Sequence, residues 1–430
     1  MTICVVGLWH LGTVTAACLA SAGHDVVGLD FDPDTVTRLR GGRAPLFEPG
    51  LDDLLAAGLA AGRLRFTGEA AEAVRDAELV WVAFDTPVDE DDRADVEFVV
   101  ERTARLFPHL RDGALVLVSS QVPVGTVGRM ERAFDVCASG RRVSFACSPE
   151  NLRLGNAVAA FTSPGRVVVG LRSAADRQSL AALFAPFTER IEWMSVESAE
   201  MTKHAVNAFL ATSVAFINEL ASLCEQVGAD AAEVERGLKS EPRIGPGAYL
   251  SPGGAFAGGT LARDVVFLSQ MGQSYGLPAS LFNGVKASND AHRQWAGRRL
   301  AHVLGDVRDV AVAVWGLTYK PGTDTLRRSA SLELCRWLVE RGAMVRAHDP
   351  AVTALPAEFA AIRLADPLSA VTGASALVVS TPWPVYQEVD ASAVASSMAR
   401  GVVLDANGFL RATLGAHSGL EYYTVGKARV

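Results

Sequence analysis

The 430-residue chain lacks the features that mark several classes of protein. Its six cysteines form no Cys-x-x-Cys pair and have no histidine at metal-ligand spacing, so they predict reduced, mostly buried thiols and no metal site. The net charge of -8 predicts no basic surface for nucleic acid or acidic membranes. Strand-like sequence begins at Thr2, which leaves no room for a signal peptide, and no apolar run is expected to reach transmembrane length. These absences favour a cytoplasmic protein.

What remains is the composition of an ordinary globular protein. Hydrophobic residues make up 49% of the chain and charged residues 20%. Because a single hydrophobic core does not grow to this chain length, we expect two or three domains.

The first 30 residues read as strand, tight turn, helix, strand and acid. The apolar run Ile3–Gly7 is followed by Gly12 and a helix from about residue 13 to 22, and the run Asp25–Leu29 ends at Asp30. This order is typical of a dinucleotide-binding unit, in which the helix N-terminus offers amides to a pyrophosphate. Asp30 would accept hydrogen bonds from ribose hydroxyls and repel a 2′-phosphate, which favours NAD over NADP. Trp9 stands where the fingerprint has glycine, so a plain strand–turn–helix that binds no nucleotide stays open.

Site-type residues follow three further apolar runs. The runs are Leu79–Ala83 before Thr86-Pro87, Ala114–Ser119 before Ser120-Gln121, and Val143–Cys147 before Ser148-Pro149-Glu150. The carboxyl ends of strands border the ligand crevice in open parallel sheets, so these are the right places for binding residues. A second α/β unit begins near Val310.

Several motifs, in order along the whole chain, resemble those of the UDP-glucose/GDP-mannose 6-dehydrogenase family. The matching segments are Thr86-Pro87, Val122-Pro123 with Gly125-Thr126, Ser148-Pro149-Glu150 with Leu152-Arg153, Glu200 with Lys203 and Asn207, Arg243-Ile244-Gly245, and Lys320-Pro321 with Arg327. The stretch Ala255 to Asp264 resembles the family's active-site loop, G-F-G-G-S-C-F-P-K-D. Four exchanges depart from the family, namely Gln121 for Thr, Leu154 for Glu, Arg328 for Glu and Thr260 for the nucleophilic Cys.

The resemblance implies the roles of individual residues. The implied catalytic residues are Lys203, Asn207, Asp264, Glu150 and, at the Cys position, Thr260. The implied cofactor-binding residues are Gly7, Trp9, His10, Leu11, Gly12, Asp30, Thr86, Pro87, Ser120, Gln121 and Arg327. The implied substrate-binding residues are Glu150, Leu152, Arg153, Lys203, Asn207, Arg243, Tyr249, Leu250, Gly258 and Lys320. Locally, Lys203 and Asn207 also fit a solvated helix face, and Asp264 also fits a helix N-cap or an ion pair with Arg263.

The resemblance also implies the architecture. We expect an α/β fold of two Rossmann-like doubly wound domains, joined by a long central helix and a helical domain. The expected boundaries are 1–195 for the NAD-binding domain, 196–300 for the helical dimerisation domain and 301–430 for the domain that binds a UDP- or GDP-linked sugar. One helix is predicted from Val196 to Val227, which contains no proline or glycine. In the family the arginine at Arg243 reaches a neighbour's substrate, which implies a homodimer.

Thr260 decides which reaction the sequence predicts. A cysteine captures the aldehyde and permits a second oxidation to the acid, whereas a threonine hydroxyl needs an adjacent base to do so. The preferred hypothesis is one reversible oxidation without acid formation, ending in a redox-neutral epimerisation of a higher-carbon nucleotide sugar. In lacking the Cys, the chain resembles the nucleotide-octose epimerases of lincosamide antibiotic biosynthesis. Two alternatives stay open, an aldehyde- or acid-forming dehydrogenase that uses water or a displaced nucleophile such as Cys147, and a non-catalytic nucleotide-sugar binder.

Overall fold

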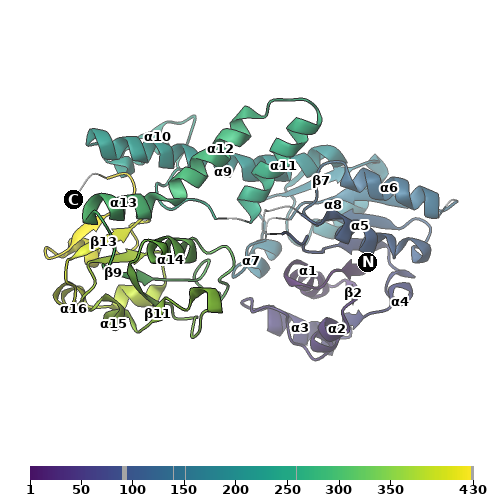
Figure 1. Ribbon diagram of the computed structural model, residues 1–430. Helices are drawn as coiled ribbons and strands as arrows, with labels where there is room; N and C mark the ends of the chain where they lie inside the picture. The colour runs from purple at the N-terminus through teal and green to yellow at the C-terminus, as the bar shows by residue number, and fades with distance from the viewer. Residues whose placement is uncertain (90–93, 139, 151, 258, 428–430) are drawn as a thin grey trace. The chain divides into compact units, whose positions relative to one another are not determined.

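The computed structural model describes residues 1–89, 94–138, 140–150, 152–257 and 259–427. Within them the chain forms two compact units, Met1–Val206 and Asn207–Val430, and each has its own sheet. Figure 1 shows the first unit in purple to teal and the second in teal to yellow.

The sheet of the first unit has eight strands among the described residues, in the order β3-β2-β1-β4-β5-β6-β7-β8. The strands are β1 Thr2–Val6, β2 Asp25–Leu29, β3 Leu64–Thr67, β4 Leu79–Val82, β5 Leu115–Val118, β6 Ser144–Cys147, β7 Val167–Leu171 and β8 Ile191–Ser195. All neighbours are parallel except β6 and β7. The helices are α1 His10–Ser21, α2 Pro33–Arg40, α3 Leu51–Ala60, α4 Ala70–Val74, α5 Val96–Ala104, α6 Thr126–Cys137, α7 Ala157–Thr162 and α8 Arg177–Phe184.

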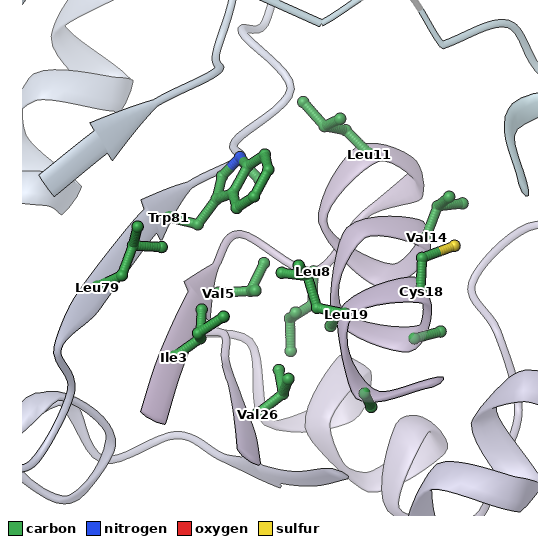
Figure 2. Close-up of a cluster of buried hydrophobic side chains, with 14 of the residues drawn as sticks. Ile3, Val5, Leu8, Leu11, Val14, Cys18, Leu19, Val26, Leu79 and Trp81 are labelled. Atoms are coloured by element: carbon green, nitrogen blue, oxygen red, sulfur yellow. The ribbon is translucent and has the colours of Figure 1, made fainter. Parts of the chain in front are cut away.

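The central strands β1, β4 and β5 of this sheet are almost entirely apolar, because helices cover both faces of the sheet there. Ile3 and Val5 of β1 belong to the cluster beneath α1, while Cys4 and Val6 belong to the cluster on the opposite face. Figure 2 shows the first cluster, with side chains of β1, β2 and β4 facing α1. A strand buried on both faces needs a continuous apolar run rather than an alternating one, which is why these segments are visible in the sequence.

The second unit contains a six-stranded parallel sheet within the described residues, in the order β11-β10-β9-β12-β13-β14. Its strands are β9 Ala311–Trp315, β10 Met344–His348, β11 Arg363–Leu364, β12 Ala376–Val379, β13 Val402–Asp405 and β14 Glu421–Tyr423. Its helices are α10 Ala231–Ser240, α11 Thr260–Ser274, α12 Ser280–Arg293, α13 Trp295–Leu304, α14 Ala330–Glu340, α15 Pro367–Val371 and α16 Ala391–Ser397. Helices α11 and α12 pack against each other, as Figure 1 shows.

Helix α9, Val196–Val227, begins in the first unit and ends in the second. Val196 and Ala199 pack into the core of the first unit, whereas Ala221 and Cys224 pack into the core of the second. The helix is 32 residues long with a mean hydropathy of 1.4 over its most apolar window, so the expectation that no segment has transmembrane length and composition needs correction. Core helices of soluble proteins share these properties, and 44% of that window is buried inside the structure.

The predicted fold class is confirmed, since the described residues form two sheets, one mostly parallel and one fully parallel, and a long central helix. The predicted strands end within a residue or two of the observed ones, and α9 has the predicted bounds. The division into three domains stays a prediction.

Candidate active site

The turn between β1 and α1 requires its two glycines. Gly7 adopts a φ of +89°, and a Cβ on it would lie 2.8 Å from backbone atoms of Phe84. A Cβ on Gly12 would lie 1.8 Å from the carbonyl oxygen of Gly7. The start of α1 therefore packs directly on the turn that precedes it, which only glycine permits.

Two features of this turn bear on a dinucleotide. The Oδ2 atom of Asp30 accepts the amide of Leu8 at 2.7 Å, and its Oδ1 atom accepts the amide of Asp32 at 3.0 Å, so the carboxylate is fixed at the end of β2. Trp9 is the N-cap of α1, with 46% of its surface exposed and no side-chain hydrogen bond to the helix. The turn thus accommodates a side chain at the position of the second glycine and leaves the helix amides uncapped.

A buried hydroxyl lies at the carboxyl end of β5. Ser120 is 4% exposed, and its Oγ atom has no hydrogen-bond partner among the described residues. Its neighbour Gln121 accepts the hydroxyl of Thr86 on its backbone carbonyl at 2.7 Å, and Pro87, after Thr86, is exposed. Since buried polar atoms are nearly always paired, the free capacity of Ser120 fits a bound ligand at this edge of the sheet.

Lys203 and Glu150 meet within the first unit. The Nζ atom of Lys203 donates to the carbonyl oxygen of Glu150 at 2.5 Å, and the lysine is 9% exposed. The carboxylate of Glu150 accepts the amide of Leu152. The lysine predicted from a four-residue helical spacing is therefore buried against the loop that follows β6, and a solvated surface position is excluded.

Asn207 and Asp264 meet within the second unit. The Nδ2 atom of Asn207 donates to Oδ2 of Asp264, whose side chain is fully buried. Asp264 lies inside α11, whose N-cap is Gly259, so the interpretation of Asp264 as a helix N-cap is wrong. Thr260 is the first residue of α11 and is exposed, so the predicted loop already ends before it.

Four side chains hold the segment that leads into α11. Asn218 accepts the amide of Gly253 at 3.0 Å, and Nε2–H of His292 donates to the carbonyl of Gly253 at 2.8 Å. Asn407 accepts the amide of Gly254 at 2.9 Å. Asn289 accepts the amide of Phe256 at 3.0 Å and donates to its carbonyl at 2.8 Å. Side-chain amides here replace the backbone partners that a strand would have.

The turn after β9 in the second unit resembles the turn after β1 in the first, but the acid near it is buried. Gly316 has a φ of +89°, like Gly7. Asp349, after β10, accepts the amides of Leu317 and Thr318 at 2.7 and 2.9 Å. Its Oδ2 atom also accepts the indole of Trp383 at 3.0 Å, and the residue is 4% exposed. Asp349, which occupies the position equivalent to Asp30, is therefore covered by residues of its own unit.

Three segments of the chain each match a domain of one protein family. Residues 1–188 match the NAD binding domain of the UDP-glucose/GDP-mannose dehydrogenase family, residues 197–291 its central domain and residues 313–412 its UDP binding domain. The chain is 37% identical to the UDP-glucose 6-dehydrogenase of Pseudomonas aeruginosa over 100% of this chain and 98% of that protein. This protein belongs to that family.

Two further relatives cover nearly the same length. The UDP-glucose 6-dehydrogenase of Rhizobium meliloti is 33% identical over 99% of this chain and all of its own. The structure of a UDP-glucose dehydrogenase from Pyrobaculum islandicum superimposes with a TM-score of 0.88 at 32% identity, covering 99% of this chain and 98% of that one. The chain is accordingly an enzyme of the NAD-dependent nucleotide-sugar oxidoreductase fold, and its cofactor is NAD.

The remaining predicted site residues differ in how far their side chains are buried. Leu11 and Leu250 are 6% and 8% exposed. Figure 2 shows Leu11 on the first turn of α1 within the apolar cluster, so its side chain packs in the core and only its backbone is left for a cofactor. Leu250 is likewise a core side chain of its unit. Arg153, Arg243, Tyr249 and Arg327 are exposed and Lys320 half-buried, while Gly258 lies outside the described residues.

Sequence reasoning missed the residues that hold the site in place. Glu48 in the loop before α3 accepts a hydrogen bond from His10 at 3.0 Å. A lone glutamate before Pro49 and Gly50 is typical of an ordinary turn, so the sequence gives no sign of this contact. Asn289 and His292 read as polar residues of a surface helix, although both are buried.

Cys147 is not a displaced nucleophile. The thiol is buried in β6, and burial, followed by the nearby Glu200 and Glu197 carboxylates, raises its pKa well above its ordinary value. A thiol that stays protonated at neutral pH is a poor nucleophile. Cys147 is therefore one of the buried thiols that the sequence predicts.

The close approach in the first turn makes Gly12→Ala a sensitive substitution. We expect it to destabilise the protein by roughly 1–3 kcal/mol or more, because a backbone oxygen occupies the new methyl's position, and to weaken NAD binding. Gly237→Ala on α10 is the matched control, since nothing lies within 4 Å of a Cβ there. Urea unfolding and calorimetric NAD titration measure both effects. Equal stability of the two variants would contradict the packing described.

The buried His292 predicts a pH dependence of stability. Burial lowers the pKa of His292 below 6.5, against the opposing hydrogen bond to Gly253. The unfolded chain therefore binds this proton first, so the free energy of unfolding falls as pH drops below about 6.5, by at most about 1.4 kcal/mol per pH unit. His292→Gln should show a shallower fall between pH 7.5 and 5.5 in urea unfolding, with the exposed His302→Gln as control. Identical slopes in all three proteins would contradict the assignment.

Proposed function

We propose that this protein is an NAD-dependent dehydrogenase that oxidises the carbinol at the C6 position of a nucleotide-linked sugar to a carbonyl, in one reversible two-electron step. The observations that carry the proposal are the pairing of Lys203 with the Glu150 loop in the first unit and of Asn207 with Asp264 in the second. Thr260, at the family's Cys position, is the exposed first residue of α11. The UDP-glucose 6-dehydrogenases among its relatives support a UDP-sugar as substrate.

Lys203 and Asn207 act on the same oxygen. They lie four residues apart on α9 and so project from one face of the helix. Lys203 takes up the hydroxyl proton and then stabilises the developing oxyanion, and the second amide hydrogen of Asn207 donates to that oxygen. Asp264 fixes the orientation of the Asn207 amide through its hydrogen bond.

Glu150 has a separate place in the proposal. Its carbonyl holds Lys203 and its carboxylate is engaged by the amide of Leu152, so the loop as a whole sets the position of the lysine. With one oxygen of the carboxylate still able to accept, Glu150 is the further acid–base group for the hydroxyl proton.

The first unit binds the cofactor through groups that the structure leaves available. The uncapped amides of α1 would hold the pyrophosphate, Asp30 would accept hydrogen bonds from the ribose hydroxyls, and Ser120 would offer its buried hydroxyl. NAD, when bound, accepts the hydride. Binding sugar and cofactor together makes hydride transfer an intramolecular step, which removes most of its entropic barrier.

The second oxidation lacks its nucleophile. A threonine hydroxyl attacks a carbonyl only when an adjacent base removes its proton, whereas a cysteine is partly ionised near neutral pH. Gln121 and Leu154 replace the Thr and Glu of the family's pattern near this step. We infer that the product leaves as a carbonyl compound together with NADH.

Epimerisation is the second candidate. An enzyme that stops after one oxidation can return the hydride to the other face of the carbonyl, and the exchange at Thr260 favours such a stop. This route requires a secondary carbinol, as in a higher-carbon nucleotide sugar. The relatives are dehydrogenases, and they favour release of the carbonyl over the redox-neutral route.

We propose further that the protein is a homodimer through α9. Phe209, Phe216 and Leu223 lie seven residues apart on this helix and are 70%, 51% and 59% exposed, a spacing that forms one apolar stripe. A second copy of the same stripe is its natural cover in a two-fold dimer. Arg243 lies at the surface, where it pairs with Glu241. In the proposed dimer it would exchange this partner for a neighbour's substrate.

The proposal for the reaction predicts unequal effects of two substitutions. Thr260→Ala should leave hydride transfer within about tenfold of the parent, because the hydroxyl takes no part in it. Lys203→Ala should slow it by about 100- to 1,000-fold, the effect of losing one donor to an oxyanion. Stopped-flow NADH absorbance with UDP-glucose and other nucleotide sugars measures both. Equal losses, or a thousandfold loss in Thr260→Ala, would refute the roles assigned.

The dimer predicts that Phe216→Asp dissociates the protein in multi-angle light scattering at micromolar concentration, because a carboxylate cannot be buried unpaired in the stripe. Val136→Asp on α6 is the control, since Val136 is an exposed apolar residue of the first unit. It should leave the dimer intact. A parent protein that is already monomeric would rule out the dimer.

A further inference from the structure

Glu48 is a buried carboxylate that receives three donors. It lies in the loop before α3, and its side chain is fully buried. Its Oε2 atom accepts Nε2–H of His10 at 3.0 Å and the amide of Gly155 at 2.8 Å. Its Oε1 atom accepts the amide of Ala157 at 2.7 Å. A carboxylate in such surroundings persists only when its oxygens are satisfied, and here they are.

The donors to Glu48 come from two functional segments of the first unit. His10 is the first residue of α1 and belongs to the turn that receives the pyrophosphate. Gly155 and Ala157 close the loop that begins at Glu150. At its other end this loop is held by Lys203 through the carbonyl of Glu150. One side chain therefore fixes the cofactor turn and the loop of the reaction centre against each other.

The charge state of Glu48 fits this arrangement. Burial by itself would raise the pKa of Glu48, but the hydrogen bonds from His10, Gly155 and Ala157 prevail and hold it below its ordinary value. The carboxylate is ionised at neutral pH, and its bonds to the three N–H groups are charge-assisted and short. A neutral amide at this position has a single acceptor atom and cannot satisfy donors on both sides.

We propose that Glu48 is a positioning residue that couples binding of NAD to binding of the nucleotide sugar. The inference rests on the proposed function in one respect, that the loop from Glu150 to Ala157 contacts the sugar substrate. Bound NAD would fix the turn at His10, the hydrogen bonds of Glu48 would hold the loop against that turn, and the loop would hold Lys203. Each ligand then tightens the other by the same factor, as thermodynamic linkage requires.

The test varies the donor rather than the buried acid. His10→Phe removes the donor, whereas His10→Gln keeps an N–H at similar reach. Calorimetry gives the Kd for NAD alone, for UDP-glucose alone, and for UDP-glucose with saturating NADH. We expect His10→Phe to weaken NAD by about tenfold and to abolish the mutual tightening, and His10→Gln to recover most of both. Glu48→Gln should reproduce the loss of coupling, and Glu97→Gln, an exposed acid paired with Arg129, is the control.

The outcomes separate this inference from its alternatives. Loss of thermal stability in His10→Phe with unchanged NAD affinity and unchanged coupling would mean that Glu48 is purely structural, and would overturn the proposal. Equal losses in His10→Phe and His10→Gln would overturn it too, because the hydrogen bond would then be irrelevant. Failure of the parent protein to bind any UDP-sugar would instead refute the proposed function, while the effect of His10→Phe on NAD affinity alone would still test the tie between Glu48 and the turn.

Discussion

The hydrogen bonds made from one face of α9 are the constraint on which the rest of the account depends. Lys203 and Asn207 are one helical turn apart, and each is held by a different partner, the carbonyl of Glu150 and the carboxylate of Asp264. An uninterrupted helix keeps two such groups at a fixed separation, since it contains neither proline nor glycine. The proposed function assigns both side chains to one substrate oxygen, because donors that are held in place before a ligand binds stabilise an oxyanion without reorganisation.

The two sheets show how one turn serves two purposes. Gly7 and Gly316 have the same left-handed conformation, and an acid follows the next strand in each unit. Asp30 keeps part of its surface open, whereas Asp349 is sealed by the indole of Trp383. The carboxylate of Asp349, which follows the strand after the second turn, is therefore not exposed to accept hydrogen bonds from the ribose of a dinucleotide. The match of residues 313–412 to a UDP binding domain agrees with that difference.

The sequence allowed the fold to be predicted well and the site in part. Doubly buried strands are continuous apolar runs, and α9 has no internal breaker, so both were visible without a structure. The burial of the Leu11 side chain could not be predicted, because a position in a motif does not show which way the side chain points. The side chains that hold the site segments could not be predicted, because their partners lie far away in the sequence. Glu48 bonds Ala157 across 109 positions, and Asn407 bonds Gly254 across 153. A turn glutamate and a loop asparagine carry no local sign of such partners.

The exchange at Thr260 gives the account its central claim, that oxidation stops at the carbonyl. The most direct measurement is mass spectrometry of the sugar product after prolonged turnover with excess NAD and UDP-glucose, together with the NADH formed per sugar consumed. We expect a product lighter than the substrate by about 2 mass units, as loss of one hydride and one proton requires, and no more than one NADH per sugar. A product heavier by about 14 mass units, the difference between CH2OH and COOH, would show a nucleophile-assisted second oxidation and contradict the account.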